Sequence, residues 1–72
     1  MEKYMSRKNT LHFKGEMVRA GYTIGSLATE LGISRSTLSS RINGITDFLK
    51  SEMERIGELF CKPPADIFFT VT

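Results

Sequence analysis

The sequence has almost none of the residues with which small proteins build covalent or metal cross-links. Among its 72 residues are one cysteine, Cys61, one histidine, His12, and no tryptophan. One thiol cannot form an internal disulfide, and one thiol with one imidazole falls short of the three or four ligands of a usual zinc site. The chain is therefore expected to fold by helix packing, with or without dimerisation. A lone thiol also fits a reducing cytoplasm.

Long apolar runs and catalytic motifs are lacking as well. No stretch approaches membrane-spanning length, and the polar start MEKYMSRKN is not expected to act as a signal peptide. The sequence has no Gly-x-x-x-x-Gly-Lys-[Ser/Thr] loop for nucleotide phosphates, and a domain of this size offers no deep pocket. These absences argue against an enzyme, a cofactor, a metal site, a small-molecule substrate and a membrane partner.

Charge is distributed unevenly along the chain. The first 19 residues carry a net charge of +3, residues 20–42 carry +1, and residues 43–72 carry −2. A basic first half and an acidic second half suggest one face for a polyanion and another for a different partner. A solvated surface with chance asymmetry explains the same numbers, so charge alone does not decide between them.

Helix signals divide the chain into a short arm and one domain. Residues 1–9 are predicted to be a flexible polar arm, and residues 10–72 a helix-turn-helix domain. The first helix is expected to begin near Thr10 and to end before Gly21, which suits a left-handed C-cap.

Two short helices should follow in close succession. Thr23 is a suitable N-cap for a helix over residues 24–31, which Gly25 weakens. Ser34 is the next N-cap, and its helix should occupy about residues 34–42. Two short helices joined by a tight glycine turn are the sequence outline of a helix-turn-helix.

The last third of the chain is expected to add two helices and an apolar tail. Ser51 and Glu54 have capping-box spacing, although residues 49–50 offer an earlier start for the fourth helix. Pro64 suits the first turn of a short fifth helix. The tail IFFTVT is expected to be a short strand or a packed extended end.

That apolar tail has two interpretations. Ile67 and one phenylalanine are expected to point inward and close the core. The rest would form a dimer or partner patch, for which the candidates are Phe68, Phe69 and Val71.

The stretch GISRSTLSSRING, residues 32–44, has the composition of a nucleic-acid-reading helix. Leu38 and Ile42 lie one turn apart and should face the core. The residues left to point outward are Arg35, Ser36, Thr37, Ser39, Ser40 and Arg41. Short hydroxyls permit close approach of the backbone, and arginine reaches phosphates or guanine. An ordinary solvated face is the alternative, but such a face more often uses Glu, Lys and Gln than Ser and Thr.

The segment YTIGSLATELGISRSTLSSRING resembles the helix-turn-helix of the Cro/phage-repressor (XRE-like) family. The matching features are Thr23, Leu27–Ala28, the turn Gly32–Ile33–Ser34, Leu38 and Asn43–Gly44. The resemblance extends from about Leu11 to Phe69. It implies an all-α domain of five helices that binds double-stranded operator DNA, often as a symmetric dimer.

The resemblance also implies roles for individual residues. Residues expected to face base edges are Arg35, Ser36, Thr37 and Ser40. Residues expected at flanking positions or phosphates are Ser39, Arg41 and Asn43, with Lys14 and Arg19 as supplements. The caps Thr23 and Ser34 and their neighbour Ile24 border the same surface.

One position departs from the family pattern. Many members have glutamine after the N-cap threonine of the second helix, where it braces a phosphate, whereas this chain has Ile24 followed by Gly25. The departure removes a phosphate donor and places an apolar residue beside the DNA face. The chain also resembles the modulator-of-repression proteins of temperate phages of lactic-acid bacteria. That resemblance implies an alternative, an antirepressor that binds the resident repressor protein through the helix-turn-helix face.

Overall fold

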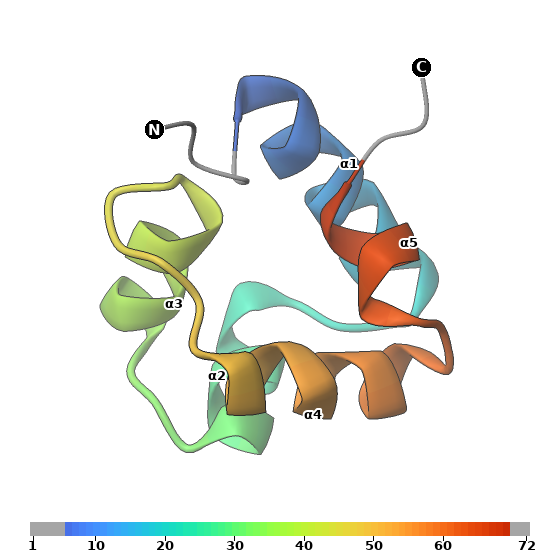
Figure 1. Ribbon diagram of the computed structural model, residues 1–72. Coiled ribbons are helices and arrows are strands. Elements are labelled where there is room, and N and C mark those ends of the chain that lie inside the picture. Colours follow the sequence, from blue (N-terminus) through green and yellow to red (C-terminus); the bar gives the residue numbers. More distant parts are fainter. Residues whose placement is uncertain (1–5, 70–72) are drawn as a thin grey trace.

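A computed structural model describes residues 6–69, which form five helices and contain no strand. The helices are α1 (Arg7–Arg19), α2 (Ile24–Leu31), α3 (Arg35–Ile42), α4 (Lys50–Phe60) and α5 (Pro64–Phe68). Figure 1 shows α1 and α5 together on one side, α3 on the other, and α4 running between them. The predicted all-α fold with five helices is confirmed.

Helix α1 begins three residues earlier than the sequence predicted. The Ser6 hydroxyl accepts a hydrogen bond from the Asn9 N–H at 3.3 Å and so caps the helix. Residues 7–9, expected in the polar arm, are therefore the first turn of α1. Residues 1–5 of the expected arm lie outside the described part of the chain.

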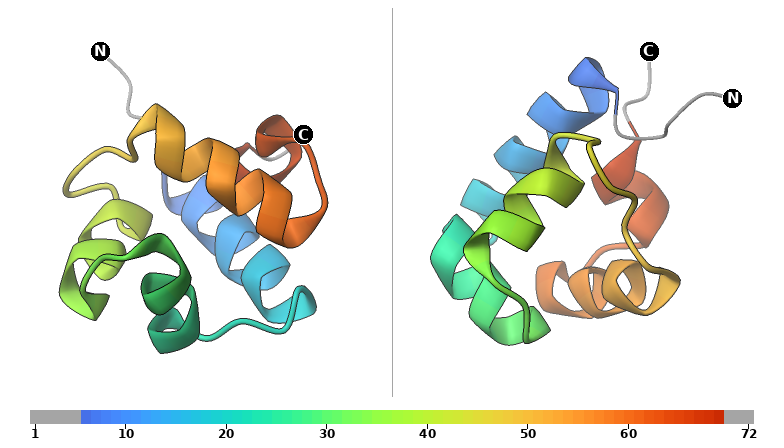
Figure 2. Two further views of the ribbon diagram at one scale, coloured as in Figure 1. Left: turned by 90° about the horizontal axis from the view of Figure 1, so that it is seen from below. Right: turned by 90° about the vertical axis from the view of Figure 1, so that its left-hand side faces the viewer.

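The predicted ends of the two central helices are confirmed by their hydrogen bonds. Thr23 and Ser26 cap α2 reciprocally, since each hydroxyl accepts from the other residue's N–H, at 3.1 and 2.9 Å. Gly32 ends α2 with a φ of 71°, a left-handed conformation that favours glycine. The Ser34 hydroxyl then accepts from the Thr37 N–H at 3.1 Å and starts α3. Figure 2 shows the resulting pair, α2 followed closely by α3.

The start of α4 follows the earlier of the two predicted positions. Lys50 is its first residue, and the Leu49 N–H donates to the Glu52 carboxylate at 2.9 Å. The capping box expected from Ser51 and Glu54 is therefore wrong. Glu52 already satisfies the unpaired N–H at this helix end, so the chain turns helical before it reaches Ser51.

The core is built around one aromatic side chain of α1. Phe13 has no exposed surface, and its ring lies 5.7 Å from Phe48, 5.9 Å from Phe60 and 5.3 Å from Phe68, measured between centroids. The other buried apolar residues are Met17, Leu27, Ala28, Leu38, Ile42, Ile56 and Ile67. All five helices contribute to this cluster, which fixes α2 and α3 against α1 and α4.

The C-terminal apolar residues divide between core and surface. Ile67 and Phe68 are fully buried, which confirms that one phenylalanine points inward. Phe68 therefore cannot belong to a surface patch, contrary to expectation, because Phe13 and Phe48 already cover its ring. Phe69 is 41% exposed. Val71 lies outside the described residues.

Candidate nucleic-acid interface

The first turn of α3 presents a polar, exposed surface. Ser34, Arg35 and Ser36 are exposed, whereas Leu38 and Ile42 are fully buried, as the sequence predicted. The right-hand view of Figure 2 shows α3 facing the viewer with no other helix in front of it. Thr37 is half-buried, and its hydroxyl accepts a hydrogen bond from the Ser34 hydroxyl at 2.8 Å. The capping hydrogen bonds thus hold the hydroxyls of this turn in defined positions.

The second half of α3 is less exposed. Ser39 and Ser40 are half-buried, and only Asn43, at the C-cap, is exposed. The Asn43 amide donates to the Ser39 hydroxyl at 3.3 Å. The Ser40 carbonyl accepts from the backbone N–H groups of Ile45 and Thr46, at 2.9 and 3.3 Å. This half of the helix therefore anchors the connection to α4 as well as facing outward.

A hollow of about 380 Å³ opens beside α3, where three helices meet. It is lined by Lys14 of α1, Ile24 of α2, Ser39 of α3 and the α3 C-cap Asn43. The remaining lining residues are apolar: Met17, Val18 and Ile42. The structure thus brings together four of the residues that the sequence assigned to the interface. Ile24 is half-buried against the core rather than fully exposed.

Val18 was not predicted to lie at this hollow. Its side chain is 68% exposed, next to the buried Met17 in the chain. In the sequence, Val18 is an apolar residue that lies outside the Phe13–Met17 stripe of α1. A single exposed apolar residue does not by itself indicate a binding surface.

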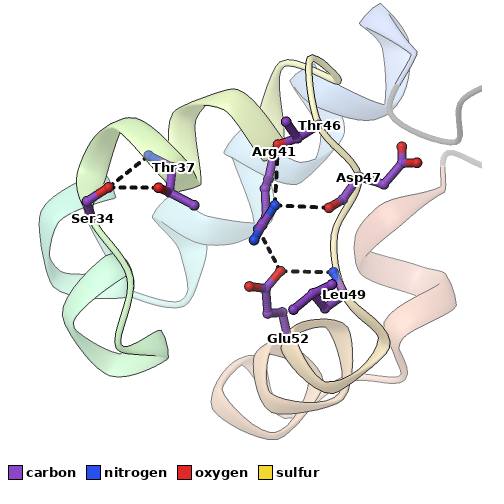
Figure 3. A network of polar contacts seen from close by, with 7 residues as sticks. All are labelled: Ser34, Thr37, Arg41, Thr46, Asp47, Leu49 and Glu52. Carbon is purple, nitrogen blue, oxygen red and sulfur yellow. Dashed lines mark hydrogen bonds and ion pairs between the residues drawn. The ribbon is translucent and has the colours of Figure 1, made fainter.

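Arg41 does not point outward as the sequence predicted. Its side chain is only 17% exposed, and its Nε atom lies 2.8 Å from Glu52 Oε1, within ion-pair distance although without hydrogen-bond geometry. Its Nη1 atom donates to the Thr46 hydroxyl at 3.3 Å and to the Asp47 carbonyl at 3.2 Å (Figure 3). The reason is the buried Glu52 carboxylate, which requires a cation beside it. Arg41 therefore joins α3 to α4.

Comparison with known proteins agrees with this arrangement. A family model described as helix-turn-helix matches residues 16–67. This chain belongs to the helix-turn-helix family. The matched range contains α2, α3 and α4 complete. No curated protein and no solved structure gives a significant match. Family membership indicates a DNA-binding transcription regulator, which is the coarse function that the resemblance implied.

In this helix-turn-helix domain Arg19 lies at the end of α1 and is tied to an acidic residue. Its side chain is 72% exposed and forms an ion pair with the buried Glu16, which also binds Lys62. The hydrogen bond from Lys62, aided by the charges of Lys62 and Arg19, lowers the pKa of Glu16 below 4.5, against the opposing effect of burial. Arg19 is thus available at the surface, but part of its charge is balanced by Glu16.

Two negative findings apply to residues 6–69. No helix in this range is long and apolar enough to span a membrane. No three His, Cys, Asp or Glu side chains in the same range gather where they could hold a metal ion.

Proposed function

We propose that this protein regulates a phage or prophage lysogeny switch in a bacterial cytoplasm, binding operator DNA with the N-terminal half of α3. The observation that supports the proposal is the exposed first turn of α3, which carries Ser34, Arg35 and Ser36 on a face opposite the buried Leu38. A helix of this kind, braced by a preceding helix, is the element that enters a major groove.

Arg35 and Ser36 are the residues proposed to read base edges, with Thr37 and Ser40 behind them. Arg35 has no hydrogen bond or ion pair within residues 6–69, so its donors are available to an acceptor such as guanine. Thr37 and Ser40 are half-buried, so less of each side chain is available to a base edge.

Phosphate contacts are proposed for residues around the hollow. Lys14 of α1 and Asn43, the C-cap of α3, are exposed and line it, and Ser39 lines it as well. Arg19 and the α2 N-cap Thr23 are also exposed and supplement this set. Arg41 is left out of the proposed contacts because Glu52 holds it inside the domain.

The test is a fluorescence anisotropy titration on labelled intergenic DNA from beside this protein's own gene, at about 50 and 200 mM salt. We expect saturable binding that weakens steeply with salt. Arg35→Ala should cost roughly 1–3 kcal/mol on the preferred sequence and little on unrelated DNA. Arg55→Ala is the control, because it removes the same charge from α4, where Arg55 pairs with Glu30 and Glu58. Equal losses for the two variants would contradict base reading by Arg35.

The apolar side of the hollow favours a second candidate function, the antirepressor. Ile24 and Val18 offer a surface that suits a protein better than a phosphate backbone. In this alternative the partner is the phage repressor protein, and the protein strips it from its operator at near one-to-one stoichiometry.

The substitution Ile24→Gln separates the two functions. It restores a polar donor beside the DNA face, so it should strengthen DNA binding by an operator reader and weaken a complex with the repressor. The two titrations are run side by side, one on free DNA and one on DNA already bound by the neighbouring repressor. Saturable binding of the wild-type protein to free DNA, strengthened further in the variant, excludes a purely protein-directed role.

A further inference from the structure

Gly25 lies in the first turn of α2, where its backbone does not need a glycine. Its φ is outside the left-handed region, unlike those of Gly21, Gly32 and Gly44. Glycine at a helical φ lowers stability relative to alanine, because it raises the conformational entropy of the unfolded chain, which is lost on folding. The missing side chain at this position must therefore be explained by what surrounds it.

The space beside Gly25 is occupied by the guanidinium of Arg35. A Cβ atom added at Gly25 would lie 2.7 Å from Arg35 Nη2, 2.8 Å from Nε and 3.0 Å from Cζ. The separations from Nη2 and Nε are shorter than those that real Cβ atoms show, so the guanidinium would have to move. Gly15 in α1 provides the contrast, because a Cβ there would meet nothing within 4 Å. The charged end of Arg35, and not only its stem, thus rests on the α2 backbone.

We propose that Gly25 is a positioning residue that fixes the orientation of Arg35 on the DNA-reading face. This inference rests on the proposed DNA-binding function. Arginine has many side-chain conformations, and ordering them on binding costs affinity. A guanidinium already seated on Gly25 presents its fork of donors in fewer orientations, which favours bidentate recognition of one base. A side chain at residue 25 would push the guanidinium away at little cost to the fold, because Arg35 is exposed and its side chain can turn into solvent.

The test compares Gly25→Ala with the control Gly15→Ala. Both substitutions should raise the midpoint of thermal unfolding by about 4 °C, because both replace a helical glycine. Only Gly25→Ala should weaken binding, by roughly tenfold, to the duplex that the wild-type protein enriches from a randomised library. If Gly25 had a purely structural role, the substitution would not raise the unfolding midpoint and at the same time weaken DNA binding. Unchanged affinity in a stabilised Gly25→Ala variant would overturn the proposal.

A double-mutant cycle tests whether the effect passes through Arg35. In the Arg35→Ala background, adding Gly25→Ala should leave the affinity unchanged, because the group that it displaces is already gone. A further tenfold loss in that background would show that residue 25 acts on DNA by another route, and would overturn the proposal.

A measurement on the free protein separates this inference from the proposed function. In NMR spectra of the isotope-labelled wild-type protein, Arg35 Hε should show nuclear Overhauser contacts to the Gly25 Hα atoms, and these contacts should disappear in Gly25→Ala. Their absence in the wild-type protein would overturn the positioning role whether or not DNA binds. If these contacts are present but the protein enriches no duplex, Gly25 does position Arg35, and DNA is not the ligand of Arg35.

Discussion

The two arginines of α3 have opposite environments. Arg35 is exposed, with its guanidinium lying over Gly25, whereas Arg41 is largely buried against Glu52. A charge at the surface can be exchanged between water and DNA, but a charge paired inside the domain cannot leave without exposing its partner. The side chains are six residues apart and chemically identical, so burial alone distinguishes the proposed reading role of Arg35 from the structural role of Arg41.

Arg41→Ala should therefore destabilise the domain by about 2 kcal/mol, since it leaves the Glu52 carboxylate buried without its cation. Arg35→Ala should change the free energy of unfolding by less than about 0.5 kcal/mol. Urea unfolding of the two variants measures both values.

Glu52→Gln provides the control for Arg41. The glutamine keeps an oxygen for the Leu49 N–H but removes the charge, so Arg41→Ala should cost less in the Glu52→Gln background. Additive losses in the double variant would mean that the ion pair itself contributes nothing.

Glu16 should make stability depend on pH in the acid range. Its pKa is lowered in the folded protein, mainly by the hydrogen bond from Lys62, from an ordinary value of 4.5. Its contribution is therefore complete above that value and is lost as the pH falls through the lowered pKa. Because Lys62 is 45% exposed, solvent screens the pair and the contribution should stay below about 1 kcal/mol.

The measurement is urea unfolding of the wild-type protein and Glu16→Gln at a series of pH values from about 7 to 3. The difference in the free energy of unfolding between the wild-type protein and Glu16→Gln should be constant near neutral pH and should vanish in acid. Lys62→Met should raise the pKa of Glu16. NMR titration of the Glu16 carboxyl carbon measures that pKa. A wild-type advantage that grew on acidification would contradict the assignment.

At the scale of the helices, hydroxyl caps mark where α1, α2 and α3 begin. Ser34→Ala removes the hydroxyl that accepts from the Thr37 N–H and should cost about 1 kcal/mol. Ser51→Ala should change stability by less than about 0.5 kcal/mol, because Ser51 lies inside α4 and caps nothing. Thermal or urea unfolding compares the two, and a larger loss for Ser51→Ala would restore the capping box that the sequence suggested.

The sequence predicts features that depend on neighbouring residues, and it misses those that depend on contacts between different helices. Thr23, Gly32 and Ser34 act on backbone groups within three or four residues, so their roles were readable from spacing. The position of Arg41 depends on Glu52, which is eleven residues away and on another helix. The spacing of apolar residues along one helix does not reveal such a contact. The seat of Arg35 on Gly25 was unreadable for the same reason, because the sequence showed only a weak helix former.

The start of α1 was missed for a different reason. Ser6 caps the helix ahead of a polar turn, and a prediction that follows apolar periodicity begins only where buried residues begin, near Thr10. Thr10 itself is buried, and its hydroxyl donates to the Ile42 carbonyl at 2.7 Å, which ties α1 to the end of α3.

For the whole molecule, the consequence of a small core is that single aromatic residues carry much of the stability. A domain of this size has a net stability of about 4–10 kcal/mol. Phe68 is fully buried among aromatic rings, so Phe68→Ala should cost about 3–5 kcal/mol and leave the protein partly unfolded at growth temperature.

Phe69 follows Phe68 directly in the chain but is 41% exposed, so Phe69→Ala should cost less than about 1 kcal/mol. The pair therefore separates folding from association. If Phe69 forms a contact between two copies of the chain, Phe69→Ala should shift sedimentation equilibrium toward the monomer. The unfolding midpoint of the monomer should stay nearly constant. Equal masses for wild type and variant at every concentration would remove Phe69 from any dimer contact, and would leave DNA-reading by α3 to a monomer or to a dimer formed elsewhere on the surface.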